Sequence, residues 1–172
     1  LLLRPRRFGK SLWLSTLENY YDLARADAFD DLFGQLAIGR APTPRRNGYF
    51  VMSWNFSTVD PVGDTEAIRG ALHRHINVQI AATVAKYRDQ LHGEVQVHPD
   101  DALVSFQSLL AAVSASAHRL YLLIDEYDNF ANEVLASRDR GEDRYHELVG
   151  GEGVIKTVFK AIKAAAEGRG LD

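Results

Sequence analysis

The chain has 172 residues, of which 46% are hydrophobic, 25% charged and 10% aromatic. This composition excludes a disordered or collagen-like chain, and the length suits one domain, residues 1–172. The net charge of -3 argues against a nucleic-acid binder that uses its whole surface, and the lack of cysteine excludes disulfides and a thiol nucleophile. No apolar run approaches the roughly 20 residues of a membrane-spanning helix and no secretory signal is visible, so we expect a cytoplasmic protein with no membrane partner.

The first elements expected are a strand, a loop and a helix. Leu1–Leu3 are apolar, residues 4–9 interrupt the run, and apolar residues recur at helical spacing from Lys10 onward. Because the chain opens inside an apolar run, we expect a fragment whose true N-terminus is missing. Residues 28–33 are expected to form a short helix or turn, and residues 39–48, with two Pro and two Gly, a surface loop.

The middle of the chain is expected to hold one strand and two helices. Residues 49–56 are rich in aromatic side chains and bounded by turn residues, which predicts a strand. Asp64 or Thr65 is expected to cap a helix of about seven turns. Its apolar stripe is Ile68, Leu72, Ile76, Ile80, Val84, Tyr87 and Leu91. A second helix is expected to begin at Asp100 or Asp101. Its inward face would hold Leu103, Phe106, Leu110 and Val113.

The last third of the chain contains a continuous apolar run, Leu120–Ile124, that ends in Asp125 and Glu126. An apolar run without alternation is typical of a strand buried on both faces of a parallel sheet. Residues 132–153 are expected to form a polar loop, and residues 154–167 a helix. The inward residues of this helix would be Val154, Val158, Phe159 and Ile162. Strands that alternate with helices predict an α/β fold with a mainly parallel sheet, whose ligands bind at the carboxyl ends of the strands.

The segment Arg4-Pro5-Arg6-Arg7-Phe8-Gly9-Lys10-Ser11 ends in the Gly-Lys-Ser of a phosphate-binding loop. Such a loop turns backbone N–H groups and a helix N-terminus toward phosphate, while the lysine adds a charge and the serine hydroxyl can bind Mg²⁺. The general pattern has Gly six residues before Lys10, where this chain has Arg4. The alternative is a plain strand-to-helix loop with a solvated lysine. Arg4, Arg6 and Arg7 suit an anionic ligand, with ion pairs or exposure to water as equal alternatives.

The apolar run followed by two carboxylates has the pattern of a Walker B strand. Asp125 could bind the Mg²⁺ shell opposite Ser11, Glu126 could polarise an attacking water, and Asp128 could orient this pair. The alternative is a buried strand that runs into a solvated acidic loop. The two motifs lie about 115 residues apart, in the expected order, each at a predicted strand end. The strand at residues 49–56 fits a sheet in which a strand lies between the motif strands.

At these residues the sequence resembles the AAA-ATPase-like family of bacterial P-loop proteins. Members carry Arg-Pro-Arg-Arg-Phe-Gly-Lys-Ser/Thr, here residues 4–11, followed by Leu-Ser-Thr-Leu, here residues 14–17. They also carry Leu-Ile-Asp-Glu-Tyr-Asp, here residues 123–128. Arg4 in place of glycine is the norm in this family, and the resemblance spans nearly the whole chain.

The resemblance implies a P-loop NTPase domain, a three-layer α/β/α fold truncated at both ends, that binds ATP and Mg²⁺. Family members often carry a C-terminal PD-(D/E)XK nuclease-like domain, and we expect that domain, an upstream segment and a sensor strand to be absent here. By analogy, Lys10 and Glu126 would be catalytic, and Ser11 and Asp125 would bind the metal. The nucleotide-binding residues would be Arg6, Arg7, Phe8, Gly9, Lys10, Ser11 and Leu12.

These observations leave three functions open. The first is an ATP-hydrolysing module that couples nucleotide state to an attached or partner domain, and the second is a non-hydrolysing, nucleotide-gated module for a nuclease or nucleic-acid-processing system. The third is nucleic-acid binding through the three N-terminal arginines and Arg45-Arg46. A homo-oligomer is left open. A histidine metal site is not expected, because His73 and His75 are two residues apart and do not share a helix face.

Overall fold

A computed structural model describes residues 9–60, 62–136 and 154–167. The strand expected at residues 1–3 therefore lies outside the described residues, as do Arg4, Arg6, Arg7 and Phe8. In chain order the helices and strands are α1 (Lys10–Tyr21), α2 (Phe29–Phe33), α3 (Ala37–Arg40), β1 (Tyr49–Asn55), α4 (Thr65–Lys86), α5 (Ala102–Ser114), β2 (Arg119–Asp125), α6 (Tyr127–Ala136) and α8 (Val154–Glu167). Two short 3₁₀ turns, η1 (Leu23–Ala28) and η2 (Phe56–Thr58), follow α1 and β1.

The sheet of the described residues consists of two parallel strands. β1 and β2 pair over seven residues, from Tyr49 opposite Arg119 to Asn55 opposite Asp125. Parallel neighbours require a long crossover, and α4 and α5 supply it between the two strands. Both strands therefore end at the same edge of the sheet, so Asn55 and Asp125 are neighbours there.

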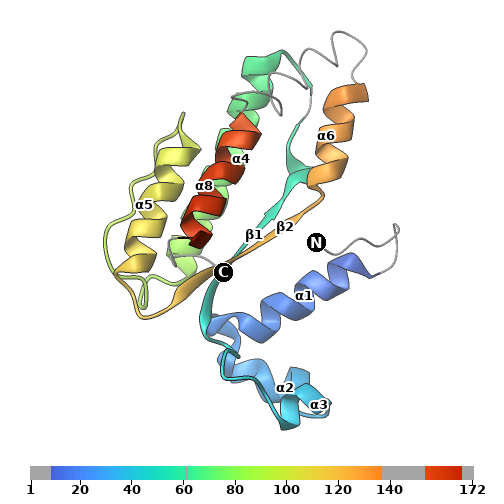
Figure 1. Cartoon of the computed structure of the whole chain (residues 1–172), viewed down its shortest axis with the longest axis vertical. Coiled ribbons are helices and arrows are strands. Elements are labelled where there is room, and N and C mark those ends of the chain that lie inside the picture. Colours follow the sequence, from blue (N-terminus) through green and yellow to red (C-terminus); the bar gives the residue numbers. More distant parts are fainter. Residues whose placement is uncertain (1–8, 61, 137–153, 168–172) are drawn as a thin grey trace.

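Helices cover both faces of this sheet, with α1 on one side of the strands and α4, α5 and α8 on the other (Figure 1). Alternate residues of β1 explain the two layers, because successive strand side chains point to opposite faces. Phe50, Met52 and Trp54 belong to the larger core, which includes α4 and α5, whereas Tyr49 and Val51 belong to a smaller cluster against which α1 packs. The expected α/β class with a parallel sheet is confirmed for this part of the chain, which is mostly helical with two strands.

The helix starts follow the predicted capping chemistry. The Asp64 carboxylate accepts a hydrogen bond from the Ala67 N–H at 2.8 Å, and the Asp101 carboxylate accepts from the Leu103 and Val104 N–H groups at 3.0 and 3.1 Å. Each carboxylate satisfies N–H groups that have no partner within the helix. Of the two alternatives offered at each start, Asp64 and Asp101 are therefore the caps.

The ends and faces of these helices differ from the prediction. α4 stops at Lys86, so Tyr87 and Leu91 continue the apolar stripe from the following turn and are buried there by tertiary packing. In α5 the buried face is shifted by one residue. Phe106 and Val113 are buried as predicted, but Leu103 and Leu110 are only half-buried. The rest of the buried face is Ala102, Ser105, Leu109 and Ala112.

Two predictions concern the segments after β2. The polar loop expected from residue 132 is wrong at its start, because α6 continues to Ala136 and buries Phe130 and Ala131. Residues 137–153 lie outside the described residues. The helix at residues 154–167 is confirmed, and its Phe159 and Ile162 pack against the larger core as expected. The side chains of Val154 and Val158 lie outside the description.

A buried polar network ties the C-terminal end of α1 to the rest of the fold. The Asp22 side chain is 0% exposed and accepts a hydrogen bond of 2.7 Å from the Tyr87 hydroxyl. Lys86 Nζ lies 2.5 Å from the second Asp22 carboxylate oxygen, and the Val51 N–H of β1 donates to the Tyr87 oxygen at 2.8 Å. Burial, and then the bond to Asp22, raise the pKa of Tyr87, so this hydroxyl stays protonated. The network therefore fixes how α1 lies against β1 and α4.

Candidate functional site

The N-terminus of α1 has the backbone of an anion site. Gly9 precedes the helix with φ 75° and ψ 22°, a left-handed conformation that glycine adopts without strain. A hydrogen bond of 2.9 Å from the Trp13 N–H to the Gly9 carbonyl closes the first turn of α1. The N–H groups of Lys10, Ser11 and Leu12 therefore lack partners within the helix, and Gly9 has no side chain that could cap them. Among the described residues, a Cβ atom added at Gly9 would meet no atom within 4 Å.

The carboxyl end of β2 also passes through a left-handed residue before a helix. Glu126 has φ 56°, and its N–H donates to the Asp125 carboxylate at 3.0 Å. Its carbonyl accepts from the Phe130 N–H at 3.1 Å, which begins α6. A left-handed non-glycine residue costs about 1–2 kcal/mol, and such conformations cluster at functional sites. Glu126 shares this backbone conformation with Asn47, and only Glu126 lies next to the predicted metal ligand Asp125, which makes its turn a candidate functional position.

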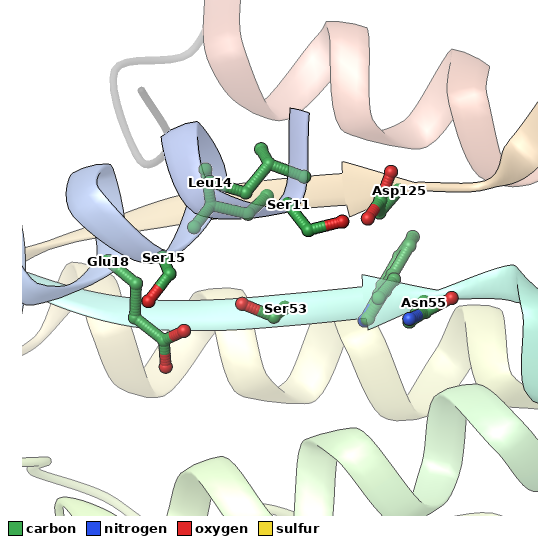
Figure 2. Close-up of a pocket in the computed structure, with 9 residues that line it drawn as sticks. Ser11, Leu14, Ser15, Glu18, Ser53, Asn55 and Asp125 are labelled. Carbon is green, nitrogen blue, oxygen red and sulfur yellow. The ribbon is translucent and has the colours of Figure 1, made fainter. Parts of the chain in front are cut away.

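A pocket of about 200 Å³ joins these two features at the carboxyl edge of the sheet. Its lining residues come from α1, β1 and β2, and they are Ser11, Leu14, Ser15, Glu18, Ser53, Trp54, Asn55, Leu123 and Asp125. Figure 2 shows the Ser11 hydroxyl and the Asp125 carboxylate pointing toward one another across the pocket. The structure thus brings together two residues that lie far apart in the sequence and that we predicted as metal ligands.

The other predicted residues occupy different positions around this pocket. Lys10 is half-buried and Leu12 is exposed in the first turn of α1, and neither belongs to the pocket lining. Glu126 is half-buried next to Asp125 but does not line the pocket either. Asp128 is exposed in the first turn of α6, so it does not hold the Asp125–Glu126 pair as a buried group would.

The charges of the lining residues favour a cation more than a bare phosphate. Glu18 and Asp125 are carboxylates, and no lysine, arginine or histidine lines the described pocket. Hydroxyl and carboxylate oxygens are the ligands that Mg²⁺ prefers, and Mg²⁺ is commonly held by one or two carboxylates together with substrate phosphates. The residues present therefore fit Mg²⁺ between Ser11 and Asp125, with an anion on the N–H groups of the α1 N-terminus.

Four polar lining residues were not predicted: Ser15, Glu18, Ser53 and Asn55. Asn55 had a usable signal, because it is the last residue but one of the strand predicted at residues 49–56, and polar residues at strand ends meet at the ligand-binding edge of a parallel sheet. Glu18 had none, since an acidic residue on an amphipathic helix is usually solvated. Glu18 lies 3.9 Å from Lys86 Nζ, which links the pocket to the buried Asp22 network.

His73 and His75, the two histidines of α4, make separate contacts. His73 Nδ1 accepts a hydrogen bond from the Ala102 N–H at 2.8 Å, and His75 Nδ1 lies 3.2 Å from the Thr58 hydroxyl. Burial lowers the pKa of both rings. In the part of the chain that the structure describes, no three His, Cys, Asp or Glu residues gather as a metal cage. Its helices also include none that is long and apolar enough to cross a membrane.

The Arg45-Arg46 loop lies at the opposite end of α1 from Gly9. The Thr43 N–H donates to the Tyr20 hydroxyl at 2.8 Å and the Asn47 N–H to the Tyr20 carbonyl at 2.9 Å, which anchors this loop to the last turn of α1. Arg46 stacks over the Phe29 ring at 4.4 Å. A helix of 12 residues spans roughly 18 Å. These arginines therefore do not share a surface with the start of α1.

The fold is an α/β fold in which the start of a helix and a carboxylate at the end of a strand line the same pocket. This arrangement is typical of nucleotide-binding proteins. The comparisons with known proteins agree. A family model described as "Predicted AAA-ATPase" matches residues 1–169, so the chain belongs to the predicted AAA-ATPase family. Membership implies nucleotide binding and hydrolysis in general. No curated protein and no solved structure matches the chain.

Proposed function

We propose that the protein binds ATP with Mg²⁺ at this pocket, hydrolyses it, and couples the nucleotide state to an attached or partner domain. The observation that carries the proposal is the meeting of Ser11, at the start of α1, with Asp125, at the end of β2, on one pocket. Family membership supports nucleotide hydrolysis, and the carboxylate and hydroxyl of the pocket support Mg²⁺ as the accompanying ion.

Each residue of the site has a distinct role in this proposal. The N–H groups of Lys10, Ser11 and Leu12, which follow Gly9, bind phosphate oxygens. Arg6, Arg7 and Phe8 stay predicted nucleotide-binding residues that lie outside the described residues. The Lys10 ammonium neutralises the terminal phosphates. Ser11 and Asp125 hold Mg²⁺, which supplies positive charge to the phosphate oxygens. The Glu126 N–H orients the Asp125 carboxylate through their 3.0 Å hydrogen bond.

Glu126 is the base in the proposed reaction. Its carboxylate accepts a proton from the water that attacks the terminal phosphorus, while the bond from that phosphorus to the bridging oxygen breaks and ADP leaves. The left-handed turn places Glu126 directly after the proposed metal ligand. α6 begins one residue later and packs Phe130 into the larger core. A change at Glu126 on hydrolysis would therefore reach α6. The partner that responds to this change in α6 is a nuclease-like domain, another protein or a second copy of the chain.

Replacing Glu126 by glutamine tests hydrolysis directly. Glutamine keeps the size of the side chain but cannot accept the proton, so we expect phosphate release to fall about 10²- to 10⁴-fold while MgATP affinity stays within about threefold. Glu94→Gln, the same change at an exposed residue of the connector between α4 and α5, is the matched control. Turnover that is unchanged in Glu126→Gln would favour the alternative, a non-hydrolysing module gated by nucleotide.

A further inference from the structure

Asn55 is a polar residue of the pocket to which the proposed reaction assigns no role. It ends β1 and is the registered partner of Asp125 on the neighbouring strand. Both residues line the pocket, and Asn55 is exposed. Of the lining residues, only Asn55 and Trp54 carry an N–H donor in the side chain, and the Trp54 indole nitrogen is buried away from solvent. The Asn55 amide is therefore the accessible nitrogen donor of this lining.

The hydrogen bonds of Asn55 fix which way its amide faces. The amide oxygen accepts from the Ser57 N–H at 3.0 Å, as in a turn capped by asparagine. Because the oxygen faces η2, the amide nitrogen faces the other way, and Figure 2 shows it on the side of the amide toward Ser53, another residue of the pocket lining. Among the described residues, no acceptor is bonded to this nitrogen.

The turn that carries Asn55 is firmly held. The Thr58 hydroxyl donates to the Asn55 carbonyl at 3.1 Å and also contacts His75 of α4 at 3.2 Å. Phe56, between them, is 2% exposed and anchors η2 in the larger core. A donor that is fixed before the ligand arrives loses little entropy on binding, which makes its hydrogen bond more effective.

We propose that the Asn55 amide donates a hydrogen bond to an oxygen of the terminal phosphate of ATP, and so makes the pocket prefer ATP to ADP. This inference rests on the function proposed above. The amide oxygen of Asn55 is already engaged, so the amide can offer a ligand only its N–H donors. Such a donor binds a negatively charged oxygen more strongly than it binds water. In the proposed site the Mg²⁺ held by Ser11 and Asp125 accompanies the terminal phosphate. Asn55 is the neighbour of Asp125 in register, so an oxygen of that phosphate is the anionic acceptor we infer for the amide.

The test compares the affinities of Mg·ADP and of a non-hydrolysable Mg·ATP analogue in the wild-type protein and in Asn55→Ser. Serine can still accept from the residue 57 N–H but has no donor of the same reach. We expect the affinity for the ATP analogue to fall about 10- to 100-fold, and that for ADP to stay within about threefold. Asn55→Asp keeps the shape and replaces the donor by a charge, so its loss of ATP preference should be larger.

Two variants separate this role from a structural one. Asn132→Ser makes the same change at an exposed residue of α6 and should retain the ATP preference. Thr58→Val removes the hydroxyl that holds the turn but keeps the Asn55 amide, so it should weaken the ATP preference less than Asn55→Ser does. An equal loss of ADP and ATP affinity in Asn55→Ser, or no loss of either, would overturn the inference while the proposed function stands. A wild-type protein that binds neither nucleotide would overturn both.

Discussion

Asp22→Ala is expected to lower the free energy of unfolding by about 3 kcal/mol. The substitution removes the acceptor of the buried Tyr87 hydroxyl, the partner of Lys86 and the 2.8 Å bond from the Ala24 N–H. A hydrogen bond to a charged group contributes about 1.5–3 kcal/mol and a helix cap about 1 kcal/mol, whereas Lys86 recovers part of its loss because its side chain is 32% exposed. Urea unfolding followed by far-UV circular dichroism measures the change.

Asp27→Ala, at an exposed residue of η1, is the matched control and should stay within about 0.5 kcal/mol of the wild type. If Asp22→Ala lowered the free energy of unfolding no more than Asp27→Ala does, the buried network would not contribute to the stability of the fold. The outcome also bears on the site, since this network holds the C-terminal end of the helix whose N-terminus begins at Lys10.

Asp125→Asn is expected to reduce ATP turnover by about 100-fold or more. Asparagine can still accept the Glu126 N–H through its amide oxygen, so the turn after β2 should keep its conformation. It lacks the negative charge that binds Mg²⁺, and the transition-state stabilisation supplied by a metal ion is on the order of 3 kcal/mol, or about two powers of ten in rate. Phosphate release measured across a Mg²⁺ titration gives both the rate and the metal dependence.

The matched control is Asp128→Asn, which makes the same change at an exposed residue of the first turn of α6 and should leave turnover near the wild-type value. Higher Mg²⁺ should restore part of the lost rate in Asp125→Asn, since weaker metal binding can be offset by mass action. If the rate of Asp125→Asn equalled that of the wild type at every Mg²⁺ concentration, Asp125 would not be a metal ligand.

Much of the secondary structure is predictable because short-range chemistry determines it. The aromatic run that begins at Tyr49 and the apolar run that ends at Ile124 are typical of strands in a parallel sheet. Burial on both faces is confirmed for most of β1, whereas β2 is buried only at Leu120 and Leu123 and half-buried elsewhere. The Asp64 and Asp101 carboxylates cap helices because no intrahelical acceptor exists for the first N–H groups. The end of α4 is not predictable in this way, since Tyr87 is buried by contacts with β1 and Asp22 that the helical period does not encode.

The candidate site was predictable in part for a related reason. Ser11 and Asp125 belong to recognisable local patterns, and the rule that ligands bind at the carboxyl ends of parallel strands places them at one edge. Asn55 lies at the same edge near the end of a predicted strand, but its pairing with Asp125 appears only from the register of the two strands. Asp22 resembles an exposed acidic residue in the sequence, because the partners that make its burial stable come from β1 and α4.

The most direct test of the proposed function is a MgATP titration of the wild-type protein and Lys10→Ala, followed by tryptophan fluorescence. Trp13 is 50% exposed two residues after Ser11, and Trp54 lines the pocket, so both probes lie at the site. We predict a saturable signal in the wild type and its loss in Lys10→Ala, with circular dichroism spectra that show both proteins folded. No saturable binding by the folded wild type, or equal affinity in Lys10→Ala, would contradict the assignment of this pocket as a nucleotide site.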